Sequence, residues 1–207
     1  KITNKPIEVI TNGYDVSKKI IPNLDSQFTL VHIGSLLSNR NPEILWKVLS
    51  EIKNENEEFS KDLSIKLMGA VSDDVLKSIE DFGLANNCKA YGYISHQEAI
   101  QQQHNSQVLL LVEMDTPETK SIIPGKLFEY LAAKRPILAL GPEGSDVNEI
   151  LKETNSGSYF NYKDKESLKS QIQEYYKDYS KNQLNVSSKN IEQFSRRELT
   201  KKMSDLI

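Results

Sequence analysis

Short apolar runs alternate along the chain with longer segments whose apolar residues recur every three or four positions. A short apolar run between turn residues is typical of a buried strand, whereas the three-to-four spacing is typical of one face of a helix. Strands are therefore predicted at 28–33, 64–68, 89–91, 108–112, 136–140 and 158–160. Because helical segments lie between them, the pattern predicts a single α/β domain with a doubly wound parallel sheet.

Four of the predicted strands run into a glycine, at Gly34, Gly69, Gly92 and Gly141. In a doubly wound sheet the ligand crevice lies outside the carboxyl ends of the strands. These glycines are therefore expected to line the mouth of a binding site. Arg40 follows the first glycine loop, just before a predicted helix, and its guanidinium could bind a diphosphate there. The alternative is an ordinary surface arginine.

The segment 121–140 combines a loop, a helix and a strand, and the helix is predicted to begin near Pro124 and Gly125. The residues of its inward face share helical spacing: Leu127, Phe128, Leu131 and Ala132. At the helix start, free amides, the positive end of the dipole and the Lys126 ammonium would converge, which predicts an anion site. Glu129, one turn further on, adds an acceptor for a sugar hydroxyl. We interpret the segment as a phosphate-and-ribose cradle; the alternative is a βαβ unit that binds nothing.

Capping residues predict where the other helices begin. Asn41 is expected to cap the helix that carries Ile44 to Ile52, with Pro42 in its first position. Ser95 and Glu98 form a capping box for a later helix. The inward face of the helix between them is predicted to carry Val75, Leu76, Ile79 and Phe82. A single final helix is predicted at about 189–206.

Composition excludes some classes of function. The formal net charge of -3 gives no electrostatic reason to expect a nucleic-acid partner. Cys88 is the only cysteine, so the chain holds no internal disulfide and no cysteine zinc cluster. No run approaches the ~18 apolar residues of a membrane span. Glu113 and Asp115 could hold a metal as paired carboxylates, but loop acids of this kind are usually solvated, so no metal site is expected.

Other catalytic patterns are weak or missing. The sequence contains no Walker loop, no G-x-G-x-x-G motif for NAD and no convincing Ser/His/Asp set. His32 lies within a predicted strand and is expected to be a packed residue. His96 and His104 lie near the start and end of a polar helix, and neither is near a plausible nucleophile.

Five motifs, in this order, resemble the C-terminal half of a GT-B glycosyltransferase, most nearly the retaining family 4 type. They are Asn12-Gly13-x-Asp15, Gly34-x-Leu-x-x-x-Arg40, Leu-Met-Gly69, Tyr-Gly92-Tyr-Ile and Pro-Gly-Lys126-Leu-Phe-Glu129-Tyr-Leu-Ala. The resemblance covers nearly the whole chain, and the last motif is its most specific part. It implies a Rossmann-like sugar-nucleotide-binding domain at 1–184 and a helix in 185–207 that crosses to an N-terminal half. Because the chain opens at Lys1 without a methionine, that half is expected to precede it.

The resemblance implies a nucleotide site made of Gly34, Ser35, Arg40, Gly69, Tyr93, Ile94, Gly125, Lys126, Leu127 and Glu129. Glu129 would hold the ribose hydroxyls, and the amides near Gly125 would hold the diphosphate. Arg40 and Lys126 are the catalytic candidates, since their charges would take up the charge of the leaving diphosphate. The main chain at Tyr93 and Ile94 would meet the base.

The function implied is transfer of a sugar from a UDP- or GDP-sugar to a glycan or lipid-linked acceptor, in cytoplasmic polysaccharide biosynthesis. No metal or other cofactor is expected, and any peripheral membrane contact would belong to the absent half. Alone, the present chain is expected to bind nucleotide weakly and to be inactive. Ser35, Ser121 and Lys134 depart from the family pattern. Two alternatives therefore stay open: a non-catalytic nucleotide-binding or protein-docking module, and half of a sugar-nucleotide epimerase.

Overall fold

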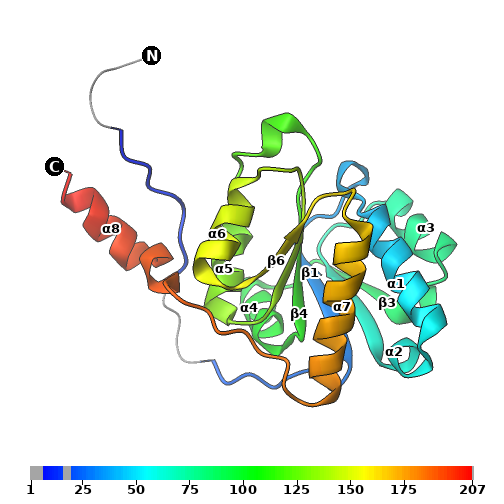
Figure 1. Ribbon diagram of the computed structural model, residues 1–207. Helices are drawn as coiled ribbons and strands as arrows, with labels where there is room; N and C mark the ends of the chain where they lie inside the picture. The colour runs from blue at the N-terminus through cyan, green and yellow to red at the C-terminus, as the bar shows by residue number, and fades with distance from the viewer. Residues whose placement is uncertain (1–6, 16–19, 207) are drawn as a thin grey trace.

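The computed structural model describes residues 7–15 and 20–206, which form a single α/β domain. Its centre is a six-stranded parallel sheet in the order β3-β2-β1-β4-β5-β6 (Figure 1). The strands are β1 (Phe28–Ile33), β2 (Leu63–Met68), β3 (Cys88–Gly92), β4 (Val108–Val112), β5 (Ile137–Leu140) and β6 (Gly157–Phe160). The predicted doubly wound sheet is confirmed. The strand order reverses between β1 and β4, and this reversal is where such sheets bind ligands.

Helices cover both faces of the sheet. They are α1 (Glu43–Glu55), α2 (Glu57–Asp62), α3 (Asp73–Asp81), α4 (His96–Asn105), α5 (Gly125–Ala133), α6 (Asp146–Thr154), α7 (Lys165–Ser180) and α8 (Arg196–Ser204). Short 3-10 turns lie at Ser38–Arg40, Ala85–Asn87, Pro117–Thr119 and Ile191–Phe194. Helices α1, α2, α3 and α7 pack on one face, and α5 and α6 on the other (Figure 1).

Strand β4 shows why the apolar pattern specifies two cores. Val108, Leu110 and Val112 join the core under α1 and α7. Leu109 and Leu111 point the opposite way and join the core under α5 and α6. Successive side chains of a strand alternate between the faces of a sheet, so a strand covered on both faces must be apolar throughout.

The start of α1 differs from the prediction. Asn41 does not cap the helix, which begins at Glu43 with Pro42 in the capping position and no side-chain cap. The Asn41 side chain instead accepts a hydrogen bond from the Trp46 indole at 2.8 Å. Trp46 is fully buried, so its N–H needs a partner, and this need takes precedence over the cap. Leu76 of α3, predicted to face inward, is exposed.

The predicted final helix is two elements. Ile191–Phe194 forms a 3-10 turn, and α8 begins after Ser195, whose hydroxyl accepts from the Glu198 amide at 3.3 Å. Ile191 and Phe194 are buried in the second core, whereas α8 buries none of its residues. No helix in the described part of the chain is long and apolar enough to cross a membrane.

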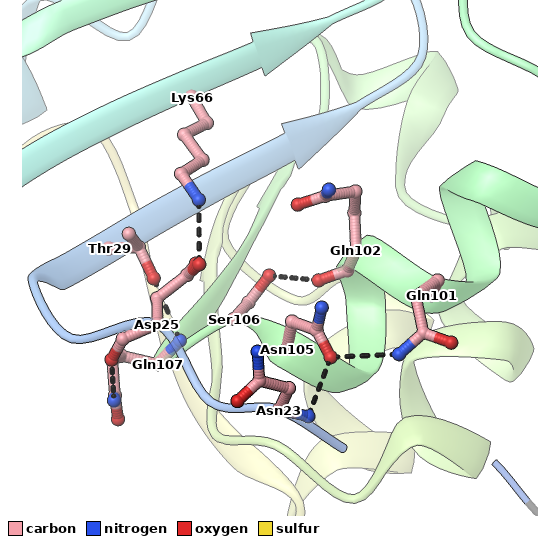
Figure 2. A network of polar contacts seen from close by, with 9 residues as sticks. All are labelled: Asn23, Asp25, Thr29, Lys66, Gln101, Gln102, Asn105, Ser106 and Gln107. Carbon is pink, nitrogen blue, oxygen red and sulfur yellow. Dashed lines mark hydrogen bonds and ion pairs between the residues drawn. The ribbon is translucent and has the colours of Figure 1, made fainter. Parts of the chain in front are cut away.

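A polar network closes the amino end of β1 (Figure 2). Asp25 pairs with Lys66 at 2.8 Å, and its carbonyl accepts from the Gln107 side chain at 2.6 Å. The Asn23 amide donates to the Asn105 side chain at 2.9 Å. These contacts hold the segment that leads into β1, at the opposite end of the strand from the glycine loop.

Candidate functional site

The glycine loops after β1 and β2 pack directly against each other. Gly34 and Gly69 have φ angles of +115° and +125°, a backbone conformation that residues other than glycine rarely adopt. A Cβ on Gly69 would lie 2.5 Å from the Gly34 carbonyl oxygen. The Gly69 amide donates to the Gly92 carbonyl at 2.7 Å, which ties in the loop after β3. The loops at Gly34, Gly69 and Gly92 therefore meet at the carboxyl ends of their strands, whereas Gly141 is buried and a Cβ there would strike Tyr159 and Glu113.

Helix α5 begins at this mouth with Gly125, and no side chain caps it. Within the described residues, the amides of Gly125 and Lys126 have no hydrogen-bond acceptor. A Cβ on Gly125 would meet nothing within 4 Å, so the space before the helix is open. The Leu127 amide differs from the expectation, because it already donates to the Pro124 carbonyl at 2.9 Å. Two free amides and the positive end of the helix dipole thus face open space.

Buried Tyr130 fixes the position of α5 relative to β1. Its hydroxyl accepts a hydrogen bond from the Ile33 amide at 3.0 Å, at the last residue of the strand. The role of Tyr130 could not be predicted from the sequence, because its hydroxyl reaches the Ile33 amide only when α5 packs against β1. The contact places the start of α5 beside the Gly34 loop.

The Lys126 side chain folds back from α5 over Gly34. Its Nζ lies 3.5 Å from Nε2 of His32 and would lie 2.7 Å from a Cβ on Gly34. Burial lowers the pKa of Lys126 from 10.5 to about 8, and the positive charge of Arg40 adds to this effect, while Glu129 opposes it. The charges of Arg40 and Glu129 thus act on the ammonium in opposite directions.

This positive charge lacks a carboxylate partner. Neither Lys126 nor Arg40 forms an ion pair with any residue in the described ranges. Arg40 ends the 3-10 turn after β1 and is partly buried. Two cations that repel each other, beside free helix amides, form an arrangement that an anion would stabilise.

Glu129 is held by α4. Its Oε1 lies 3.3 Å from Nε2 of His96, and its Oε2 accepts from the Gln103 side chain at 2.9 Å. The carboxylate borders a pocket of about 180 Å³ that α4, α5 and the segment around Tyr14 enclose, with His104 in its wall. Neither histidine could be assigned to the site from the sequence, because they lie beside the pocket at Glu129 only when α4 packs on α5.

The remaining predicted residues lie around the mouth. Ser35 is exposed after Gly34, and Tyr93 and Ile94 follow β3. The Tyr93 side chain is 85% exposed and Ile94 is partly buried.

Glu113 is not the solvated loop acid that the sequence suggested. It is buried at the end of β4, where it accepts hydrogen bonds from Tyr159 at 2.8 Å and Ser145 at 3.0 Å. Burial raises its pKa, while the two hydroxyl groups and the charge of Arg40 oppose that rise. It does not pair with Asp115, and no cluster that could hold a metal ion occurs among the described residues.

Comparisons with known structures agree with this fold. The lipopolysaccharide outer core galactosyltransferase WaaB gives a TM-score of 0.66 at 14% identity, covering 96% of this chain and 54% of its own. Sucrose-phosphate synthase from Thermosynechococcus elongatus gives 0.69 at 17%, covering 96% and 51%. TarM from S. aureus gives 0.64 at 17%, covering 98% and 39%. The chain thus has the fold of a C-terminal GT-B domain and spans about half, or less, of these proteins.

Sequence comparison identifies the family. A search of curated protein sequences finds no significant match. The family model described as "Glycosyl transferases group 1" matches residues 27–178, which include the whole sheet, the glycine loops and α5. On this match, which covers most of the chain, the protein belongs to the group 1 glycosyl transferases.

Proposed function

We propose that this chain is the donor-binding half of a glycosyltransferase that takes its sugar from a nucleotide sugar. The observation that carries the proposal is the unpaired positive charge of Lys126 and Arg40 beside the free amides that open α5. A nucleoside diphosphate carries the complementary negative charge. Family membership supports this ligand, and TarM is described in complex with UDP.

In this proposal each group has one task. The amides of Gly125 and Lys126, the Lys126 ammonium and the Arg40 guanidinium hold the diphosphate and stabilise the charge that develops as it leaves. Glu129 holds the ribose hydroxyls, oriented by its contacts with α4. The main chain after β3 meets the base. No metal or other cofactor has a part in this scheme.

The acceptor site belongs, in this proposal, to a further domain of a longer cytoplasmic enzyme. Four apolar side chains support a surface for that domain: Ile7, Val9, Met203 and Leu206 are more than half exposed. The segment at 7–15 and α8 lie side by side, joined by a bridge between Tyr14 and Ser195 (Figure 1). The finer assignment, a glycan or lipid-linked acceptor and a UDP- or GDP-sugar donor, follows the family resemblance. The present chain alone is expected to bind nucleotide weakly without transferring sugar.

Calorimetric titration with UDP, GDP and ADP tests the site. One of the three is expected to bind, and Glu129→Ala is expected to weaken it roughly tenfold or more, because a hydrogen bond to a charged group is worth about 1.5–3 kcal/mol. Glu149→Ala is the matched control, since Glu149 is exposed on α6 and, among the residues that the structure describes, pairs with Lys152 alone. If no nucleoside diphosphate binds at millimolar concentration, or if both variants behave alike, the assignment is wrong.

One observation favours a non-catalytic module instead. Ser35 and Ser121 are both exposed, and both stand at positions where the family often has charged residues. A longer form of the protein that binds a sugar nucleotide without turning it over would support this second function. Product analysis on that form would also separate transfer from epimerisation.

A further inference from the structure

His32 and Lys126 are 94 positions apart and meet inside the mouth. Nδ1 of His32 lies 3.0 Å from the Leu110 carbonyl oxygen, which can only accept a hydrogen bond. The proton is therefore assigned to Nδ1, and Nε2 keeps its lone pair. Lys126 Nζ, which can only donate, lies 3.5 Å from that lone pair.

We propose that His32 is a positioning residue: Nε2 accepts a hydrogen bond from the Lys126 ammonium and holds this charge over Gly34, where a diphosphate would lie. The identity of the ligand rests on the proposed function, whereas the contact between the two side chains does not.

A lysine at this place needs a group to hold it. Its four-carbon stem is flexible and its ammonium is strongly hydrated, so the side chain would otherwise extend into water. Arg40 repels it, and no carboxylate in the described residues pairs with it. The absence of a side chain at Gly34 leaves space for the ammonium, because any side chain there would collide with Lys126 Nζ.

His32 is suited to this role because it stays neutral. Burial, together with the positive charges of Lys126 and Arg40, lowers its pKa from 6.5 to about 3, although hydrogen bonds to the backbone of Leu110 and Ser35 oppose the shift. At neutral pH the ring therefore accepts a hydrogen bond and adds no positive charge. The titratable groups that face Lys126 are His32 on β1, Arg40 on the 3-10 turn and Glu129 on α5. Since the pKa of Lys126 is about 8, anion affinity is expected to fall as the pH rises above 8.

The contact can be tested without any ligand, by an NMR titration of the ε-carbon of Lys126. In His32→Leu the lysine should turn outward, and its pKa should rise toward the ordinary 10.5. In His32→Gln, which keeps an acceptor near the place of Nε2, the pKa should stay near 8. If the pKa in His32→Leu stays at about 8 or falls, another group holds the lysine and the proposal is overturned.

A second measurement needs no variant, in case His32→Leu does not fold. Nitrogen NMR of the wild-type ring should show the proton on Nδ1 at neutral pH. A proton on Nε2 would leave no lone pair for Lys126 and would overturn the proposal.

Binding of inorganic pyrophosphate connects the contact to function. At pH 7 the His32→Leu variant should bind it about tenfold more weakly than wild type, and His32→Gln should bind it nearly as well. Above pH 8 the wild-type affinity for a nucleoside diphosphate should fall as Lys126 loses its proton, while the terminal phosphate of the ligand, with a second pKa of about 6, no longer titrates. If the NMR results hold and neither pyrophosphate nor a nucleoside diphosphate binds, the positioning role stands and the proposed function fails. Equal pyrophosphate affinity in wild type and His32→Leu would overturn the role of His32 in binding.

Discussion

Replacing Lys126 by methionine should make the protein more stable but weaken the binding of anions at the start of α5. Methionine matches the length of the lysine stem but carries no charge. Folding lowers the pKa of Lys126 from 10.5 to about 8. At about 1.36 kcal/mol for each pH unit, the buried ammonium destabilises the native state by roughly 3 kcal/mol at pH 7. We therefore expect Lys126→Met to raise the free energy of unfolding by roughly 2–3 kcal/mol, the range of the charge penalty that it removes.

The stability difference between Lys126→Met and wild type should depend on pH. Below pH 8 the lysine is charged in both states, so the full destabilisation is present. Between pH 8 and 10.5 the unfolded chain binds more protons than the native one, so wild-type stability rises with pH. The advantage of Lys126→Met should therefore shrink to less than about 1 kcal/mol by pH 10.

Urea denaturation at pH 7 and at pH 10 measures both effects. Lys47→Met on α1 is the matched control, because Lys47 is exposed and forms no ion pair within the described residues. Its free energy of unfolding should stay within about 0.5 kcal/mol of wild type. Pyrophosphate should bind Lys126→Met roughly ten- to a hundredfold more weakly at pH 7. A variant that is no more stable than wild type at pH 7 would refute the reasoning.

Three further predictions concern groups around the mouth. Wild-type stability should fall by about 1.6 kcal/mol between pH 6.5 and pH 5 as unfolded His32 gains a proton that the native ring resists, and His32→Gln should lack this loss in acid denaturation curves. Tyr130→Phe should lower the free energy of unfolding by about 1–3 kcal/mol, because the partly buried Ile33 amide loses its acceptor. Gly69→Ala should be far more destabilising than Gly83→Ala in thermal unfolding: both have positive φ, but only at Gly69 would the new Cβ strike backbone. Equal losses for the two glycines would contradict the close packing of the loops.

The arrangement of strands could be predicted from the sequence because burial on both faces leaves little choice of residue. The run 108–112 must be apolar to face two cores, and it is buried throughout. Short-range signals such as capping residues were less reliable where a tertiary contact competed with them. Asn41 stands at the position expected of a helix cap, but its side chain accepts a hydrogen bond from the Trp46 indole instead. The final helix breaks before Ser195 because Ile191 and Phe194 dock on the core while α8 does not.

The site could be predicted only in part. Glycines that follow strands and open a helix leave a local signal, so Gly34 and Gly125 could be placed at one mouth. The partners of the charged groups leave no such signal, because they come from elements far apart in sequence. His32 reaches Lys126 only when β1 and α5 pack, and Glu113 is buried only when β6 and the start of α6 supply its hydroxyl partners.

The central claim is that the opening of α5, Arg40 and Glu129 face one ligand. An amide NMR spectrum recorded during titration with UDP, GDP or ADP tests it most directly. The amide signals of Gly34, Gly125, Lys126 and Glu129 should all shift, and all should reach their final positions at the same ligand concentration. Shifts confined to the opposite end of β1, around Asp25 and Gln107, or no shifts at all, would contradict it.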